Sequence, residues 1–220
     1  MIPLGDASRR PISYPVTTLA IIAANAFVFY LELTGGDAFI NQWSLVPAHI
    51  MAGRDLITIL TSMFMHAGWV HILGNMLFLW VFGPEIEDVM GPVAYLAFYL
   101  LGGLAATVAQ VAIDPRSTIP NLGASGAIAA VMGAFIVTYP RDKIRTVVFI
   151  GWFIQAAFLP AIVLIGLWFL IQLFSEVGAL AEAQGGGGVA YMAHVGGFVF
   201  GMVAARLFES RRRRRMQGLM

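Results

Sequence analysis

Hydrophobic residues along this chain gather in six long runs. The runs lie near residues 14–33, 69–86, 93–113, 124–140, 158–178 and 189–208. A helix needs about 20 largely apolar residues to cross the roughly 30 Å hydrocarbon core of a bilayer. The pattern therefore predicts an all-α membrane protein with six transmembrane helices. It divides the chain into an N-terminal segment at residues 1–13, a membrane domain at 14–208 and a tail at 209–220.

The fifth run begins inside a longer apolar stretch, Val147 to Phe174. As one helix at about 1.5 Å per residue it would reach about 42 Å, which is more than a bilayer core requires. Pro160 divides the stretch, because proline interrupts a helix. We interpret Val147–Phe158 as an interfacial or partly inserted segment and the remainder as the fifth span. A reading with seven spans is the alternative.

The distribution of basic residues separates the two readings, because Lys and Arg collect on the cytoplasmic side of a membrane. With six spans and the N-terminus inside, eleven of the thirteen basic residues are cytoplasmic, and only Arg54 and Arg116 lie outside. Seven spans would move the tail Arg211–Arg215 to the far side. We therefore expect six spans with both termini cytoplasmic.

Composition agrees with a membrane protein, since 59% of the residues are hydrophobic and 11% are charged. Ordinary globular domains have about 25% charged residues. The basic flanks are typical of topology signals, so we expect no nucleic-acid partner. The absence of cysteine excludes disulfides and thiolate metal sites. The first run lacks a convincing cleavage site and is interpreted as a retained span; we expect a bacterial cell (inner) membrane location.

Polar residues fall at the same depth in three spans. Spans two, four and six all run from outside to inside, and each carries its polar residues within the first two turns. These residues are His71 and Asn75 in span two, Ser125 in span four and His194 in span six. Buried polar groups in a membrane are costly and mark functional sites. Their common depth predicts one site near the outer face.

Each of Ser125 and His194 also heads a row of small residues. The rows are Ser125, Ala129 and Gly133 in span four, and His194, Gly197 and Gly201 in span six. Small residues let transmembrane helices approach closely. The approach predicts that the Ser125 hydroxyl comes within about 2.6–3.2 Å of an imidazole nitrogen, the distance that proton transfer requires.

This combination is typical of a serine hydrolase. Ser125 is the candidate nucleophile and His194 the candidate base, while the backbone N–H of Ser125, Asn75 and His71 could stabilise an oxyanion. The outer halves of spans two, four and six contain no Asp or Glu, so we expect a Ser-His dyad. Gly185–Gly188, just before span six, are expected to form a mobile flap over the site.

The motifs resemble those of the rhomboid intramembrane serine proteases. They are Thr61-Ser62-Met63-Phe64-Met65-His66, His71 and Asn75, Gly83-Pro84-Glu85-Ile86-Glu87 with Gly91, Gly123-Ala124-Ser125-Gly126, and Ala193-His194-Val195-Gly196-Gly197 with Gly201. The resemblance implies a six-helix fold that cleaves transmembrane protein substrates near the outer face. It implies structural roles for His66 in the first loop and for Glu87. Many members carry Trp-Arg in that loop, where this chain has Ile57 and Thr58.

Two alternatives stay open. One is a proteolytically inactive rhomboid-like protein that binds membrane clients. The other is a metal or proton transporter using His66, His71 and His194, although no carboxylate or cysteine joins them. For the protease we expect no metal and no cofactor, and we expect transmembrane proteins and the lipid bilayer as partners. The natural substrate and the oligomeric state are open.

Overall fold

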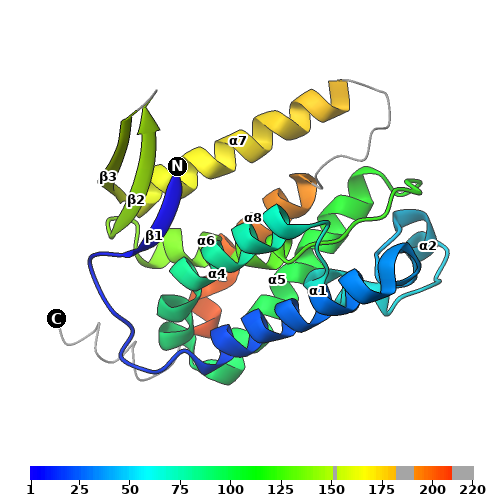
Figure 1. The fold of residues 1–220 in the computed structure, drawn as a ribbon, viewed down its shortest axis with the longest axis horizontal. Helices are drawn as coiled ribbons and strands as arrows, with labels where there is room; N and C mark the ends of the chain where they lie inside the picture. The colour runs from blue at the N-terminus through cyan, green and yellow to red at the C-terminus, as the bar shows by residue number, and fades with distance from the viewer. Residues whose placement is uncertain (151–152, 182–190, 210–220) are drawn as a thin grey trace.

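The computed structural model describes residues 1–150, 153–181 and 191–209, and it is mostly helical (Figure 1). Helices coincide with all six predicted runs: α1 Val16–Trp43, α4 Trp69–Met90, α5 Pro92–Ile113, α6 Ser125–Thr138, α7 Ala161–Ala181 and α8 Tyr191–Phe208. The connection between α1 and α4 contains α2 Pro47–Met51, α3 Thr58–Thr61 and the 3-10 turn η1 Ser62–Phe64.

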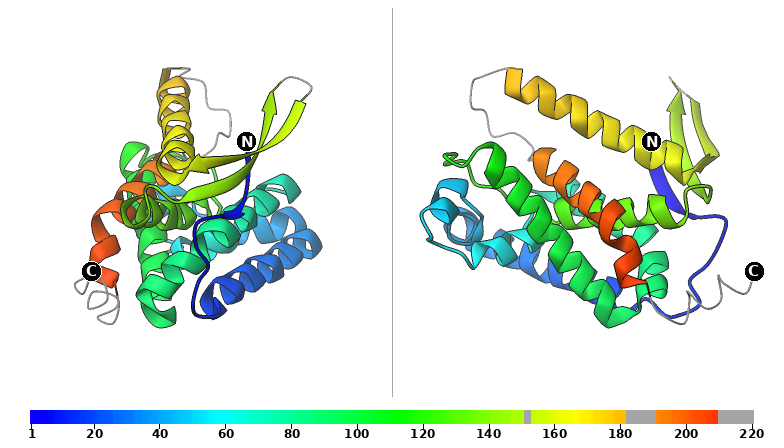
Figure 2. Two further views of the ribbon diagram at one scale, coloured as in Figure 1. Left: turned by 90° about the vertical axis from the view of Figure 1, so that its left-hand side faces the viewer. Right: turned by 180° about the vertical axis from the view of Figure 1, so that it is seen from behind.

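Four helices in the described part of the chain are long and apolar enough to cross a membrane. They are α1, α4, α5 and α8, whereas α6 and the apolar segment Ala161–Ile171 of α7 are shorter. The protein is therefore an integral membrane protein. The short α6 lies at the centre of the bundle, between α4, α5, α7 and α8 (Figure 2). Its residues from Gly126 to Phe135 are buried, as expected for an apolar helix that is covered by protein on all sides.

The structure corrects the all-α prediction. Lys143–Ile150 (β2) and Phe153–Pro160 (β3) form antiparallel strands, and Ile2–Asp6 (β1) pairs with the other edge of β2 (Figure 1). The predicted interfacial segment, Val147–Phe158, therefore belongs to a β-hairpin. The β-branched and aromatic residues of this segment favour extended backbone. Pairing between the strands provides the hydrogen bonds that the backbone N–H and C=O groups need. The position of this sheet relative to the membrane stays a prediction.

Arg9 ties the N-terminal segment to the connection between α6 and β2. Its guanidinium forms an ion pair with Asp142, with Nη2 donating to Oδ1 at 3.0 Å, and lies 3.9 Å above the ring centroid of Tyr139. The hydrogen bond to Asp142 raises the pKa of Arg9. The N-terminal strand is thus held both by sheet pairing and by a charged contact.

Small residues let α6 and α8 approach closely. A Cβ built on Gly201 would collide with the carbonyl oxygen of Ala130. One built on Gly197 would collide with that of Gly126. Backbone cannot move aside as a flexible side chain can, so these positions admit only glycine without separating the helices.

The α6 side of this contact is offset from the predicted row. It consists of Gly126, Ala130 and Gly133, whereas the prediction placed Ser125, Ala129 and Gly133 on one stripe. The side chain of Ser125 still reaches α8, where it meets His194. The close backbone contact with α8 is made by the next residue, Gly126, because successive helical residues point about 100° apart.

Glu87 joins the inner part of α4 to the start of α1. Its side chain is buried, and Oε1 accepts the backbone N–H of Thr17 at 2.8 Å. Oε2 accepts the backbone N–H and the hydroxyl of Thr18, both at 2.8 Å. These N–H groups belong to the first turn of α1 and have no intrahelical partners, so the carboxylate caps the helix.

We expect Glu87→Ala to lower the free energy of unfolding by about 2–4 kcal/mol, because hydrogen bonds to a charged group contribute about 1.5–3 kcal/mol and the buried donors would lose their acceptor. Thermal unfolding in detergent measures this effect. Asp88→Ala is the matched control, since Asp88 accepts one exposed N–H, from Ser13 at 2.9 Å. Equal destabilisation by the two substitutions would contradict the capping role.

Candidate active site

Ser125 is placed by a tight turn at the start of α6. Gly123, two residues earlier, has φ 142°, which side-chain-bearing residues rarely adopt. A Cβ there would lie 3.0 Å from Cε1 of His71 and 3.4 Å from Oγ of Ser125. The N–H of Gly123 donates to the carbonyl of Ser62 at 2.9 Å. Glycine at position 123 thus lets the turn pass between the imidazole and the hydroxyl.

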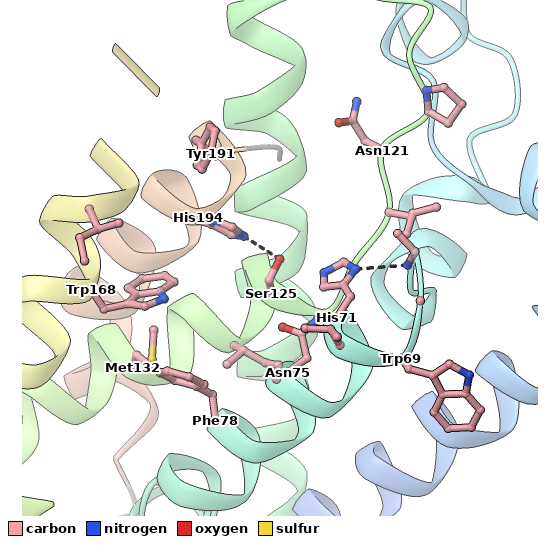
Figure 3. A pocket seen from close by; sticks show the side chains of 18 of the residues that line it. Trp69, His71, Asn75, Phe78, Asn121, Ser125, Met132, Trp168, Tyr191 and His194 are labelled. Carbon is pink, nitrogen blue, oxygen red and sulfur yellow. Dashed lines mark hydrogen bonds between the residues drawn. The ribbon is translucent and has the colours of Figure 1, made fainter. Parts of the chain in front are cut away.

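His194 lies in the first turn of α8 and meets Ser125 across the helix pair. Its Nε2 is 2.7 Å from Oγ of Ser125, inside the distance range predicted from the sequence (Figure 3). The imidazole is 6% exposed. The rings of Trp168 and Tyr191 flank it, with centroids 5.7 Å and 6.4 Å away. Aromatic contacts of this kind restrict the orientation of the imidazole.

His71 and Asn75 approach the same point from α4 (Figure 3). Nδ1 of His71 accepts the backbone N–H of Ala67 at 3.2 Å. Nδ2 of Asn75 is buried and has no hydrogen-bond partner among the described residues. An unpaired buried donor is unusual and is available to a ligand oxygen.

The four side chains line one pocket of about 1000 Å³. Its remaining walls are largely apolar and include Trp69, Phe78, Met132 and Trp168. Ser125 stands at the amino end of α6, where backbone N–H groups lack intrahelical acceptors and favour negative charge. The pocket therefore combines a hydroxyl, an imidazole and several donors in an apolar surround.

His66 lies outside the hydrogen-bonded pair and is 1% exposed. Burial, with a smaller contribution from the neighbouring His71, lowers the pKa of His66 to about 4. Its ring is therefore neutral at pH 7. It lies edge-on to the rings of Phe29 and His71, with centroids 6.4 Å and 5.2 Å away.

Two sequence predictions fall outside the described residues, namely the flap at Gly185–Gly188 and the basic tail Arg211–Arg215. Within the described ranges, no three His, Cys, Asp or Glu side chains lie in an arrangement that could hold a metal ion.

Comparison with known sequences assigns the family. The model of the Rhomboid domain family matches residues 53–211 of this chain. The chain belongs to the rhomboid family. The matched range contains every residue that lines the Ser125 pocket.

Rhomboid relatives occur in mitochondria and in bacteria. The chain is 27% identical to the mitochondrial Rhomboid protein 1 of Saccharomyces cerevisiae and 31% identical to the mitochondrial RHOMBOID-like protein 12 of Arabidopsis thaliana. These alignments cover 90% and 88% of this chain, but only 56% and 59% of the relatives. The Rhomboid protease GluP of Bacillus subtilis is 31% identical over 56% of this chain and 24% of its own length.

Three residues of this rhomboid's site were not predicted from the sequence. Trp168 of α7 flanks His194, and Gln110 of α5 accepts the backbone N–H of Ala193 at 3.2 Å, next to His194. Glu32 of α1 accepts the backbone N–H of His66. A signal existed for Glu32, because it is the one charged residue within the first apolar run. Nothing in the sequence paired Gln110 with Ala193, which lies 83 residues later.

Proposed function

We propose that this rhomboid is an intramembrane serine endopeptidase, with Ser125 as nucleophile and His194 as general base. The observation that supports it best is the 2.7 Å contact between Oγ of Ser125 and Nε2 of His194 in the wall of a pocket within an apolar helical bundle. A serine hydroxyl is a weak nucleophile until a base removes its proton. The name of GluP, a rhomboid protease, agrees with this chemistry.

The proposed reaction has two stages. Oγ of Ser125 attacks the carbonyl carbon of the scissile amide while its proton passes to Nε2 of His194. The imidazolium then gives this proton to the leaving amine, the C–N bond breaks, and an acyl ester remains on Ser125. Water attacks the ester with His194 again as base, which releases the carboxylic acid and restores the hydroxyl.

Negative charge develops on the carbonyl oxygen in both stages. The backbone N–H of Ser125 at the start of α6, the unpaired Nδ2 of Asn75 and His71 are the proposed donors to this oxygen. Removing one such donor typically lowers kcat by about 10²–10³-fold. Because these donors lie on α4 and α6, the geometry of the oxyanion site depends on how these two helices pack together.

The proposed membrane arrangement has six spans, formed by α1, α4, α5, α6, α7 and α8, with both termini in the cytoplasm. The substrates are transmembrane proteins, cut near the outer face. A helix hides its backbone amides, so substrates with small or helix-breaking residues near that end are preferred. A bacterial cell membrane is the proposed location. Because two of the relatives are mitochondrial, a mitochondrial membrane is the alternative location.

A fluorophosphonate probe, which phosphonylates activated serines with loss of fluoride, tests the proposal on purified protein. We expect wild-type protein to be labelled and Ser125→Ala and His194→Ala not to be. Ser13→Ala is the matched control, because Ser13 is exposed and lies outside the pocket. Unchanged labelling of Ser125→Ala would reject Ser125 as nucleophile. A folded wild type that takes up no probe would favour the client-binding alternative.

A further inference from the structure

Glu32 places a carboxylate inside the apolar helix α1, at the end of the bundle that holds the pocket. Its residue is 3% exposed, and both carboxylate oxygens accept the backbone N–H of His66, at 2.9 Å and 3.1 Å. A buried acidic group in a membrane helix is costly and persists where it has a use. The proposed cleavage reaction assigns it none.

The backbone that Glu32 holds leads directly to His71. The next amide along the chain, that of Ala67, donates its N–H to Nδ1 of His71 at 3.2 Å (Figure 3). A backbone amide can only donate, so Nδ1 must carry the lone pair and the proton of the neutral ring must be on Nε2. The contact therefore selects one tautomer of His71.

That tautomer directs a donor toward the nucleophile. A Cβ built on Gly123 would lie 3.2 Å from Nε2 of His71 and 3.4 Å from Oγ of Ser125. The Nε2–H of His71 and the Ser125 hydroxyl thus border the same small space. With the proton on Nδ1 instead, Nε2 would present a lone pair there, and it would repel an oxyanion.

Packing from α1 holds the same segment. Phe29, one turn before Glu32, meets the ring of His66 edge-on at 6.4 Å and that of Trp69 at 5.0 Å. α1 therefore meets this segment in two ways: Glu32 accepts the backbone N–H of His66, and Phe29 makes edge-on contacts with the rings.

We propose that Glu32 is a positioning residue for the oxyanion site. By holding the amide of His66 it orients the following amide, which fixes the tautomer and direction of His71. The proposal rests on the proposed function, because it treats His71 as an oxyanion donor. Glu32 would act on the site from α1, a helix that contributes no side chain to the pocket wall.

Cleavage kinetics of a fluorescent transmembrane substrate in proteoliposomes test the proposal. We expect Glu32→Leu to lower kcat about 10-fold or more at unchanged KM, since outright loss of an oxyanion donor lowers kcat by about 10²–10³-fold. Glu32→Gln keeps an acceptor oxygen and should restore most of kcat. Asp37→Leu, which removes an exposed carboxylate of the same helix, should leave kcat unchanged.

A double-mutant cycle shows whether Glu32 acts through His71. In a His71→Ala background, Glu32→Leu should lower kcat no further, whereas a merely structural role would lower it in both backgrounds. Full additivity, or a wild-type kcat in Glu32→Leu, would overturn the proposal. A wild type that neither cleaves nor reacts with the fluorophosphonate would instead reject the proposed function.

The tautomer can be observed directly in the wild-type protein. Nitrogen-15 NMR of histidine-labelled protein should show His71 protonated on Nε2, with assignment by His71→Ala. This measurement does not depend on any Glu32 variant folding. A proton on Nδ1 of His71 would overturn the proposal.

Discussion

Ser125→Ala should reduce the rate of cleavage of a transmembrane substrate by at least about 10³-fold, and His194→Ala should reduce it to nearly the same residual level. In the proposed mechanism a proton passes between these two side chains, which lie 2.7 Å apart, so neither would work as nucleophile or base without the other. The double variant should therefore be no slower than either single variant. Initial rates in detergent and in proteoliposomes measure these losses.

The controls are a serine and a histidine outside the pocket. Ser13 is exposed, and His49 of α2 contacts Asp55, with Nδ1 2.8 Å from Oδ2. Ser13→Ala and His49→Ala should cleave at the wild-type rate. Melting temperatures of all variants separate lost chemistry from lost folding. Losses that multiply in the double variant, or substantial cleavage by His194→Ala, would contradict a shared proton-transfer unit.

Much of the helical architecture could be predicted because a bilayer leaves few choices. A helix coincides with each of the six predicted spans, since a membrane segment must satisfy its backbone groups internally, whereas the apolar stretch Val147–Phe158 lies in the β-hairpin. The charge distribution then predicted the direction of each span, and with it a common depth for Ser125 and His194. Their separation of 2.7 Å lies in the predicted range, while their catalytic roles remain proposals.

The features that escaped prediction depend on partners far away in the sequence. Strand β1 pairs with β2 across about 140 residues, and no local pattern in residues 1–13 identifies that partner. Glu32 was visible as a charge in an apolar run, but its acceptor role depends on where the loop after η1 returns to α1. Helix rotation was also uncertain by one residue, which is why the α6 contact row begins at Gly126.

The contact between α6 and α8 gives the second large expected effect. Alanine is about 1 kcal/mol better than glycine in a helix, so Gly201→Ala would stabilise α8 if the site had room. It has none, because the new methyl group would meet the backbone of Ala130. Overpacking of this kind destabilises by about 1–3 kcal/mol, which lowers the melting temperature of a protein this size by roughly 2–12 °C.

Gly166→Ala makes the same chemical change where space is available. A Cβ built on Gly166 of α7 meets no heavy atom within 4 Å, so this variant should melt at or slightly above the wild-type temperature. Activity should separate the two variants further. His194 lies two turns before Gly201 on α8, and a shift of about 1 Å between reacting groups can lower a rate about 10²-fold. If Gly201→Ala melted and cleaved like Gly166→Ala, the close approach of α6 and α8 could not be what holds His194 against Ser125.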